Sequence, residues 1–378
     1  MRELMYFASL LGRGGYEHHA REVLRQLYKK GIKVGIKEMI KFHTRPVLLD
    51  EEIKNIIQIS TSTEVSPQAP AFWLCVPSAV RCTPGRKCIN WTTFEADRIC
   101  SLWVEKAKAI DLTIVTASYL KEAWMNSGAP EAKLAVVGEG VNPEFFNPNV
   151  PTLELYWRGK EISKVFENRI MLVAECSARK NITNAVQAYL QAFQGREDVC
   201  LILKLGKMST DIHKYVSEIK GLEKVYVFLY SLDIPETLVP QFFQLATHYY
   251  TLTHAEGWDL NCVQMGALGK VVIAPYHSAY LDYLDESRAF LITKNPKVPA
   301  QQDNNLGRLF ENANWWNPDF DEAVEVLRAA VNNKQLAEQK RQNFNRYVLD
   351  NLTWDKQVDK LIDVLASRGF LDKLEILS

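Results

Sequence analysis

The sequence predicts an α/β protein of two units, each built on a parallel β-sheet covered by helices. Short runs rich in β-branched and aromatic residues alternate with longer amphipathic segments, the order that a parallel sheet requires. The alternation starts again near residue 168, after a proline-rich stretch. The chain's 378 residues also exceed the ~100–200 residues typical of one domain.

The first half of the chain contains four strand-like runs and three helical segments. The runs are short, apolar and followed by polar or glycine-containing turns, which is typical of buried parallel strands. We expect strands over residues 4–10, 33–39, 71–76 and 112–118. We expect helices over residues 15–31, 95–110 and 118–128.

The second half repeats this pattern after a break at residues 142–167, where three prolines interrupt any regular element. We expect strands over residues 168–175, 199–206, 224–230, 248–253 and 270–275. The break predicts two domains, at residues 1–155 and 156–352. Residues 353–378 carry leucine, isoleucine and valine at helical spacing, which predicts a last helix that packs on another element.

Composition narrows the class of protein. The chain has 45 basic and 45 acidic residues, and this neutral balance lacks the broad basic field that non-specific nucleic-acid binding uses. No run approaches the ~20 apolar residues that span a bilayer, and the N-terminus lacks a signal peptide's apolar core. We therefore expect a soluble, cytoplasmic protein that does not bind nucleic acid, with peripheral membrane contact left open.

Three of the seven cysteines, Cys75, Cys82 and Cys88, lie close together in a loop-rich segment. A zinc site would need a fourth ligand and tighter pairs such as C-x-x-C, and the segment offers neither. Free thiols or a single disulfide are therefore favoured over a metal.

A glycine-rich turn follows the first predicted strand. Adjacent Gly14 and Gly15 let a ligand approach the backbone, and the amides of the following helix favour an anion such as a phosphate. A tight turn without a ligand explains the same residues, because the G-x-G-x-x-G spacing is missing. His18 and His19 lie in the first turns of this helix, where we expect them to be solvated rather than catalytic.

Two basic residues, Arg179 and Lys180, follow the first strand of the second half. The arginine fork and the lysine point charge can bind a diphosphate together. A solvated basic pair is the simpler interpretation of the two residues alone. Their place at the carboxyl end of a strand, where open sheets bind ligands, favours the binding role.

An acidic turn, Glu256-Gly257-Trp258-Asp259-Leu260, leads from the predicted strand 248–253 into a helix that carries Gln264. The Glu256 carboxylate can accept hydrogen bonds from sugar hydroxyls, while the amides at the helix start can meet phosphate or sugar oxygens. The alternative is that the acids only cap the helix, where negative charge is favoured in any case.

In this order, the segments resemble the retaining GT-B glycosyltransferases of family 4, which transfer a sugar from a nucleotide-sugar donor. Residues 12–34 are similar to the family's glycine loop and first helix, and residues 90–99 with 111–148 to the end of its N-terminal domain. Residues 179–193 resemble its arginine-lysine loop, and residues 255–275 its E-G-F-G-L-P-x-x-E block.

The resemblance implies an α/β protein of GT-B architecture, with two facing Rossmann-like domains and a C-terminal helix that crosses back to the first. Residues 1–155 would bind the acceptor and residues 156–352 the nucleotide-sugar. The helix within residues 353–378 would pack on the N-terminal domain.

The resemblance also implies roles for the candidate residues. Arg179 and Lys180 would neutralise the donor diphosphate, and Gly14 with Gly15 would close on it from the opposite domain. Glu256 would hold the transferred sugar, with Gly257 and the amides of Trp258, Asp259 and Leu260 nearby.

Several positions depart from the family pattern. The glutamate that binds the nucleotide ribose is replaced by Gln264, whose amide still donates and accepts but forms no charge-assisted bond. Trp258 and Asp259 replace a phenylalanine and a glycine. No histidine before residue 90 matches the one that many members place beside the sugar, since His43 lies too early. Glu95 is the substitute candidate on the acceptor side, with a helix-start carboxylate as an equal alternative.

The sequence thus predicts a retaining, metal-independent glycosyltransferase with no cofactor besides its nucleotide-sugar substrate, most simply UDP- or GDP-linked. The acceptor, a glycan, a lipid or a protein, stays open. Two alternatives remain. One is a binding or scaffold subunit with weakened catalysis, which Gln264, Asp259 and the missing histidine favour. The other is a nucleotide-sugar epimerase on the same fold.

Overall fold

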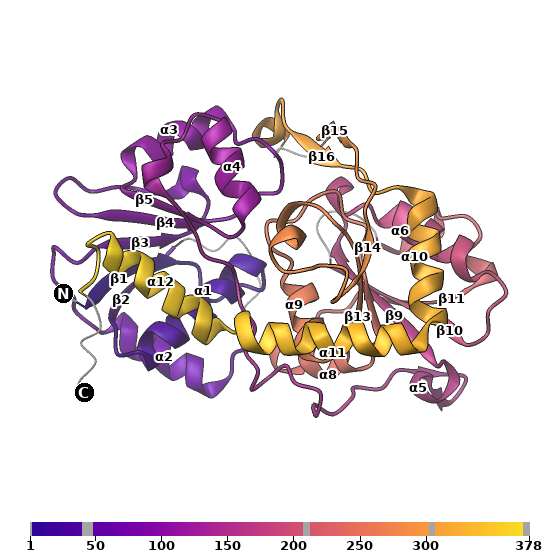
Figure 1. The fold of residues 1–378 in the computed structure, drawn as a ribbon. Coiled ribbons are helices and arrows are strands. Elements are labelled where there is room, and N and C mark those ends of the chain that lie inside the picture. Colours follow the sequence, from indigo (N-terminus) through magenta and orange to yellow (C-terminus); the bar gives the residue numbers. More distant parts are fainter. Residues whose placement is uncertain (1, 40–47, 207–211, 302–306, 373–378) are drawn as a thin grey trace. The chain divides into compact units, whose positions relative to one another are not determined.

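The computed structural model describes residues 2–39, 48–206, 212–301 and 307–372. Tertiary contacts divide the chain into two compact units (Figure 1). The first unit comprises Met1–Phe94, Arg98–Asn142 and Asn351–Ser378, and the second comprises Glu95–Asp97 and Pro143–Asp350. Each unit contains a six-stranded parallel sheet with helices, which confirms the predicted α/β class.

The first unit's sheet has the order β2-β1-β3-β4-β5-β6. Its strands are β1 (Glu3–Ala8), β2 (Lys33–Glu38), β3 (Ala71–Leu74), β4 (Cys88–Thr92), β5 (Leu112–Val115) and β6 (Leu134–Val136). All four predicted strands are present, whereas β4 and β6 were not predicted. Strand β4 contains an asparagine that would interrupt an apolar run, but Asn90 is buried and donates from Nδ2 to the Trp73 and Cys75 carbonyls.

The first unit's helices are α1 (Gly15–Lys29), α2 (Glu51–Thr61), α3 (Ser101–Ala109), α4 (Ser118–Asn126) and α12 (Trp354–Ser367), with short 3-10 turns η1 (Pro77–Ala79) and η2 (Glu131–Lys133). The prediction of a helix from residue 95 is wrong at its start, because α3 begins only at Ser101. Residues 95–97 instead form hydrogen bonds within the second unit.

The last helix, α12, packs on α1 (Figure 1). Lys30 at the end of α1 pairs with Asp355 and Asp359, each at 2.7 Å. The backbone before α12 passes so close to residue 140 that a Cβ there would lie 2.5 Å from the Trp354 nitrogen, so only glycine fits. The apolar spacing of the C-terminal segment therefore corresponds to a helix whose Trp354 is fully buried.

The second unit's sheet has the order β11-β10-β9-β12-β13-β14. Its strands are β9 (Asn168–Glu175), β10 (Val199–Gly206), β11 (Tyr226–Tyr230), β12 (His248–Tyr250), β13 (Val271–Pro275) and β14 (Phe290–Ile292). Among the described residues, two antiparallel pairs lie outside this sheet: β7 (Tyr156–Trp157) with β8 (Lys160–Glu161), and β15 (Lys297–Pro299) with β16 (Asn314–Trp316). Strands β9 and β10 have the predicted bounds, and only β14 of the main sheet was not predicted.

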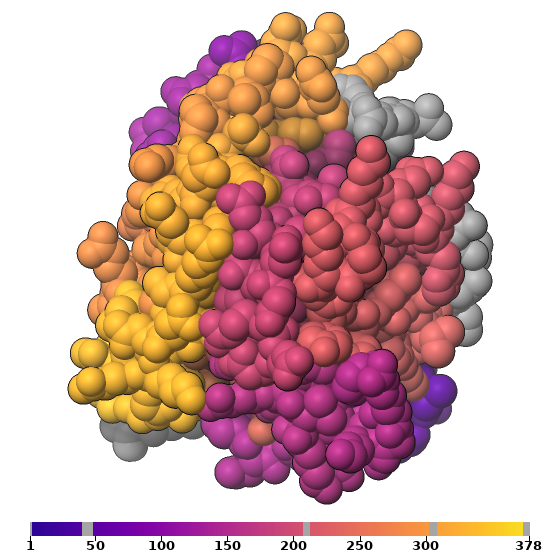
Figure 2. Space-filling model, turned by 90° about the vertical axis from the view of Figure 1, so that its right-hand side faces the viewer, coloured from indigo at the N-terminus to yellow at the C-terminus, as the bar shows by residue number. Residues whose placement is uncertain are grey.

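The second unit's helices cover both faces of this sheet (Figure 1). They are α5 (Ile162–Val165), α6 (Ile182–Phe193), α7 (Ile212–Ser217), α8 (Val239–Gln244), α9 (Leu260–Ala267), α10 (Phe320–Asn332) and α11 (Lys334–Asn351). Short 3-10 turns are η3 (Ala178–Lys180), η4 (Leu222–Lys224), η5 (Glu236–Leu238), η6 (Ser278–Asp282) and η7 (Gly307–Phe310). Helices α6 and α10 lie side by side, and Figure 2 shows them on the outer face of the unit.

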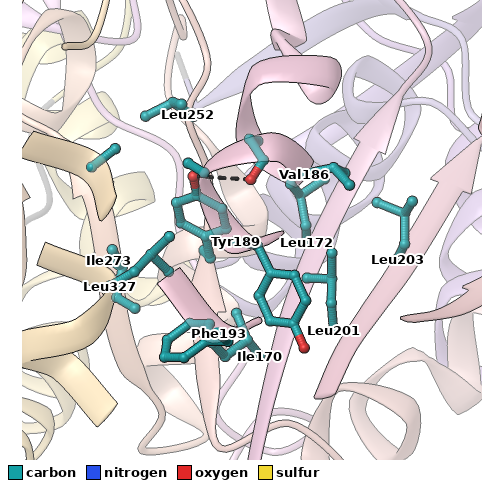
Figure 3. Close-up of a cluster of buried hydrophobic side chains, with 14 of the residues drawn as sticks. Ile170, Leu172, Val186, Tyr189, Phe193, Leu201, Leu203, Leu252, Ile273 and Leu327 are labelled. Atoms are coloured by element: carbon teal, nitrogen blue, oxygen red, sulfur yellow. Dashed lines mark hydrogen bonds between the residues drawn. The ribbon is translucent and has the colours of Figure 1, made fainter. Parts of the chain in front are cut away.

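Beneath α6 and α10 lies a continuous apolar core. Figure 3 shows side chains of β9, β10 and α6 meeting there, among them Ile170, Leu201 and Tyr189, and each of these is fully buried. Because helices cover the central strands from both sides, the middle of β9 (residues 170–174) and most of β10 are apolar. This core holds the carboxyl ends of the strands in fixed positions.

Residues 143–155, which we expected in the first domain, pack with the second unit. The Leu153 nitrogen donates to the Gln241 carbonyl at 2.9 Å, and Gln244 Nε2 donates to the Pro148 carbonyl at 2.8 Å. The prolines interrupt regular structure here, as predicted, but hydrogen bonds to α8 decide which unit the segment joins.

Cys82 and Cys88 form a disulfide, and Cys75 is a buried free thiol. The single disulfide, one of the two interpretations favoured for the cysteine segment, is therefore present between Cys82 and Cys88. No helix among the described residues is both apolar enough and long enough to cross a membrane.

Candidate functional site

The strand order of the second unit changes direction between β9 and β12. The chain leaves β9 toward β10 on one side, and β12 lies on the other, so the loops after β9 and β12 diverge at this point. Open α/β sheets bind ligands at such a switch in strand order, beyond the carboxyl ends of the strands. Arg179 and Lys180 follow β9, and Glu256 follows β12.

These three residues form one buried ion cluster. Glu256 accepts from both cations, with its Oε2 3.0 Å from Arg179 Nη1 and its Oε1 2.6 Å from Lys180 Nζ. Arg179 also donates to the Ala255 carbonyl at 2.7 Å, and its Nη2 lies 3.4 Å from Glu95 Oε1. The side chain of Glu256 is 7% exposed and those of the two cations are 16% exposed. The structure thus brings Glu95, Arg179, Lys180 and Glu256 together.

The cluster keeps Glu256 ionised. Burial alone would raise the pKa of Glu256, but the charges of Lys180 and Arg179 outweigh it and lower this pKa to about 2. Glu256 is therefore an obligate hydrogen-bond acceptor at neutral pH. The formal charges of the two cations and the two carboxylates sum to zero.

Local backbone geometry holds the two cations in place. Asn181 adopts a left-handed conformation with φ of 50°, which asparagine tolerates better than most residues, and its Nδ2 donates to the Leu252 carbonyl at 3.0 Å. The hydroxyl of Thr253 donates to the Arg179 carbonyl at 3.2 Å, and the His254 nitrogen donates to it at 2.8 Å. The loop after β12 therefore fixes the loop after β9.

Two polar residues behind Glu256, His277 and Ser278, were not predicted from the sequence. The Glu256 nitrogen donates to Ser278 Oγ at 3.2 Å, and that hydroxyl lies 3.0 Å from His277 Nδ1. His277 Nε2 lies 3.1 Å from the Thr253 carbonyl, so Nε2 carries the proton. Burial lowers the pKa of His277 to about 3, which makes the ring neutral. The sequence could have indicated these residues, because the polar pair His277 and Ser278 follows the apolar strand β13 almost directly.

Asp259 is the N-cap of α9. Its Oδ1 accepts from the Cys262 nitrogen at 3.3 Å, and its Oδ2 accepts from the hydroxyls of Tyr249 at 2.9 Å and Tyr280 at 2.7 Å. Burial, followed by the nearby charge of Glu256, raises the pKa of Asp259 to about 6. Of the two acids in the turn, Asp259 therefore caps the helix, as the alternative interpretation predicted, whereas Glu256 pairs with the two cations.

The other residues of the acidic turn surround these two carboxylates. Trp258 is 5% exposed and packs on Tyr283 with a ring separation of 4.9 Å, and the Tyr283 hydroxyl donates to the Trp258 carbonyl at 2.6 Å. Gly257 lies in the turn, and Leu260 begins α9. Gln264 is a buried residue of the same helix.

Glu95 does not lie at a helix start, so that alternative for its carboxylate is wrong. Its carbonyl accepts from Trp315 Nε1 at 2.9 Å, and two residues on, the Asp97 carboxylate accepts from the Asn314 nitrogen at 2.7 Å and pairs with Lys297 at 2.8 Å. These bonds to β15 and β16 hold residues 95–97 in the second unit beside Arg179. Nothing local in the sequence indicates this pairing.

The glycine turn of the first unit joins β1 to α1. Gly14 is the N-cap of α1, and Gly15 begins the helix. Arg21 is buried and donates from Nη1 to the Leu10 carbonyl at 2.7 Å and the Gly12 carbonyl at 2.8 Å, which fixes the turn. A Cβ on Gly15 would meet no atom within 4 Å. The turn follows β1 where the order β2-β1-β3 switches, the corresponding ligand position of the first sheet.

The prediction that His19 is solvated is wrong. His19 is 2% exposed, and its Nδ1 lies 3.1 Å from Glu139 Oε1. Its ring lies 4.3 Å from the ring of Trp91 and 5.1 Å from that of Trp354. Helix α1 directs the His19 side chain toward the interior of the unit. The location of His19 near the helix start does not by itself predict this burial. His18 is half-buried, and His43 lies outside the described residues.

No protein-family model matches the sequence, and no curated protein matches it. Solved structures do match. HepE of Anabaena in complex with UDP-glucose is 13% identical with a TM-score of 0.65, covering 97% of this chain and 99% of that one. Sucrose-phosphate synthase of Thermosynechococcus elongatus is 13% identical with a TM-score of 0.66, covering 97% and 99%. Trehalose 6-phosphate synthase of Burkholderia multivorans is 12% identical with a TM-score of 0.65, covering 98% and 99%.

These similarities extend over nearly the whole length of both chains, so they include both sheets of this protein. Because the sequence identities are only 12–13%, these similarities establish the fold alone. The chain therefore has the GT-B fold, with two Rossmann-like units, that these glycosyltransferases share.

Proposed function

We propose that this protein is a glycosyltransferase that moves a sugar from a nucleoside diphosphate sugar to an acceptor. The observation that carries the proposal is the cluster of Arg179, Lys180 and Glu256 at the switch point of the second sheet. A cation pair and a permanently ionised acceptor are the groups that a diphosphate and a sugar require. The solved HepE structure with UDP-glucose supports a UDP-linked donor.

In this proposal the second unit binds the donor. Arg179 and Lys180 hold the diphosphate, and Glu256 accepts hydrogen bonds from the transferred sugar. The donor's negative charges compete with Glu95 and Glu256 for the two cations, because the cluster is formally neutral without them. The neutral His277 and Ser278 keep the backbone of Glu256 in place during this exchange.

The cations also stabilise the leaving group. When the bond between the anomeric carbon and the phosphate oxygen breaks, negative charge develops on that oxygen, and preorganised cations lower the free energy of this state. The acceptor hydroxyl attacks from the same face of the sugar, and its proton passes to the departing phosphate. This retaining, metal-independent course follows the resemblance to family 4.

Glu95 is proposed to lie on the acceptor side of Arg179 and to orient its guanidinium through their ion pair. Gln264 is proposed to meet the ribose, Gly14 and Gly15 to approach the donor, and the first unit to bind the acceptor. A cytoplasmic location is likewise our proposal.

Calorimetric titration with UDP-glucose, GDP-mannose, ADP-glucose and dTDP-glucose tests donor binding. We expect one donor to bind the wild type, and Lys180→Met to weaken that binding roughly ten- to a hundredfold, since a charge-assisted contact to the diphosphate is lost. The control is Lys164→Met, which removes a 73% exposed lysine that pairs with Glu161 in the same unit. Equal affinity of Lys180→Met and the wild type would contradict the proposed site.

A scaffold without transferase activity is the second candidate, favoured by Gln264 and by the carboxylate of Asp259 at the start of α9. It predicts no binding of any donor at millimolar concentration. Product analysis separates the remaining alternatives. Free nucleoside diphosphate with a glycosylated acceptor indicates a transferase, and a rearranged donor indicates an epimerase.

A further inference from the structure

The start of α9 already contains an anion. Asp259 adopts a left-handed φ of 84°, a conformation that a non-glycine residue keeps only when its surroundings hold it there. Its carboxylate accepts from the Cys262 nitrogen and from two tyrosine hydroxyls, and the residue is 8% exposed. The positive end of the α9 dipole is therefore engaged by the chain's own carboxylate.

The charge of this carboxylate is poorly balanced. The groups that act on it are the neutral side chains of Tyr249 on β12, Tyr280 and Tyr283 at η6, and Cys262 on α9, together with the charges of Glu256 and Lys180. Lys180 is the single cation among these groups, and Glu256 already accepts from it at 2.6 Å. The ionised Asp259 thus adds negative charge beside the cluster proposed to bind the donor.

We propose that Asp259 is an internal anion that opposes donor binding and makes donor affinity depend on pH. This inference rests on the proposed function, because it concerns the same site. Asp259 competes with the donor's diphosphate for the positive end of α9 and repels it from Lys180. A donor binds more tightly when Asp259 is protonated and more weakly when it is ionised.

The direction of the pH dependence follows from the environment of Asp259. Burial and the charge of Glu256 raise the pKa of this carboxyl to about 6, so it ionises as the pH rises through that value. Donor affinity should therefore fall between about pH 5 and pH 7.5. The diphosphate of a nucleotide-sugar does not titrate in this range, because each phosphate is joined through one ester and the shared anhydride bond and keeps only one, strongly acidic, hydroxyl. At an effective dielectric of ~20, one like charge within ~10 Å of another changes affinity by roughly tenfold or more.

The test compares Asp259→Asn with the wild type by calorimetric titration at pH 5.5 and 7.5. UDP-glucose is the first probe, followed by GDP-mannose, ADP-glucose and dTDP-glucose. The matched control is Asp319→Asn, because Asp319 caps α10 of the same unit by accepting from the Glu322 nitrogen at 2.9 Å. We expect Asp259→Asn to bind donor at least tenfold more tightly than the wild type at pH 7.5, with little change at pH 5.5. Asp319→Asn should behave as the wild type.

The outcomes separate this inference from the proposed function. Equal affinities of the wild type and Asp259→Asn at pH 7.5 overturn the role of Asp259 and leave the transferase proposal standing. If a donor binds to Asp259→Asn but not to the wild type, the result supports both the transferase proposal and the role of Asp259. If thermal denaturation shows that both proteins are folded and neither binds a donor, the proposed donor site is overturned, and this inference with it.

A second variant keeps the inference testable if Asp259→Asn does not fold. Tyr280→Phe removes one of the two hydroxyl donors to Asp259 Oδ2 but retains the carboxyl group. Losing that hydrogen bond disfavours the ionised form, so the pH midpoint of donor affinity should move upward by about one unit. A merely structural role of Asp259 would change the affinity at both pH values and leave the midpoint where it is.

Discussion

Glu256 shows how one residue can be both a structural anchor and a candidate ligand. It is buried, yet it pairs with two cations that come from a different loop. Breaking a buried ion pair by removing one partner leaves the other charges uncompensated, which costs more than the pair itself contributes. The candidate site is therefore also part of what holds the two loops together.

Glu256→Gln should lower the free energy of unfolding at pH 7 by about 2–4 kcal/mol, because Arg179 and Lys180 lose their shared carboxylate. Urea denaturation measures the change. Because the pKa of Glu256 is lowered from 4.5 to about 2, its contribution is present above pH 4.5 and is lost as the pH falls toward 2. The variant should lack this acid-dependent loss.

The control for this substitution is Glu95→Gln. Glu95 is 27% exposed and contacts Arg179 at 3.4 Å, so its removal should cost less than about 1 kcal/mol. A comparable loss in both variants would show that Glu256 is not the centre of the cluster.

His277 should make the protein sensitive to acid. Burial lowers its pKa from 6.5 to about 3, so the stability that it contributes is fully present above pH 6.5 and is lost as the pH falls toward 3. His277→Asn should reduce the slope of unfolding free energy against pH, between pH 6 and 4, by about 1.4 kcal/mol per pH unit, the value for one proton. Denaturation curves at several pH values measure the slope, and His213→Asn, at an exposed histidine, should leave it unchanged.

At the scale of elements, the last helix depends on one close backbone approach. Val141 pairs with residues on both sides of Thr353, donating to the Leu352 carbonyl at 2.9 Å and accepting from the Trp354 nitrogen at 3.1 Å. Gly140 lies against the same backbone. The start of α12 is therefore set both by its N-cap Thr353, whose hydroxyl accepts from the Lys356 nitrogen at 3.4 Å, and by this contact with the segment after β6.

Gly140→Ala should lower the free energy of unfolding by about 3 kcal/mol or more, because its Cβ would lie 2.5 Å from a backbone nitrogen that cannot rotate away. Gly15→Ala is the matched control, since a Cβ there meets nothing within 4 Å and alanine favours a helix. Urea denaturation compares the two. A stable Gly140→Ala variant would mean that α12 is not held at this point. A loss of donor affinity in Gly15→Ala would support the role proposed for the glycine turn.

At the scale of the molecule, each of the two units has its own fully buried aromatic side chains among the described residues. Trp354 of α12 is fully buried in the first unit, and Phe193 of α6 is 1% exposed in the second. The second core consists of residues from β9 to α11. Each unit therefore contains its own apolar interior, as expected for a chain of this length.

Trp354→Ala and Phe193→Ala should each destabilise one unit by about 3–5 kcal/mol. Hydrogen exchange followed by mass spectrometry locates the effect. Trp354→Ala should accelerate exchange in α1 and β1, and Phe193→Ala should accelerate it in β9 and β10. Faster exchange in both units after either substitution would show that the two cores unfold together.

The sequence by itself determined the α/β class, the bounds of β9 and β10, and the places of Arg179, Lys180 and Glu256 after strands. These features are local: the interior of a strand buried on both faces is mostly apolar, and polar residues after the strand lie at the sheet's carboxyl edge. Periodicity likewise identified α1 and the C-terminal helix.

The tertiary structure alone decided which groups meet. Glu95 lies beside Arg179 because Trp315 and Asn314 bind its segment, and Asp259 is buried because hydroxyls of Tyr249 and Tyr280 converge on it. These contacts join residues far apart in the chain or on separate elements. Burial and pairing are properties of such non-local contacts, and they set the charge of each carboxylate, so the chemistry of the site became definite only with the fold.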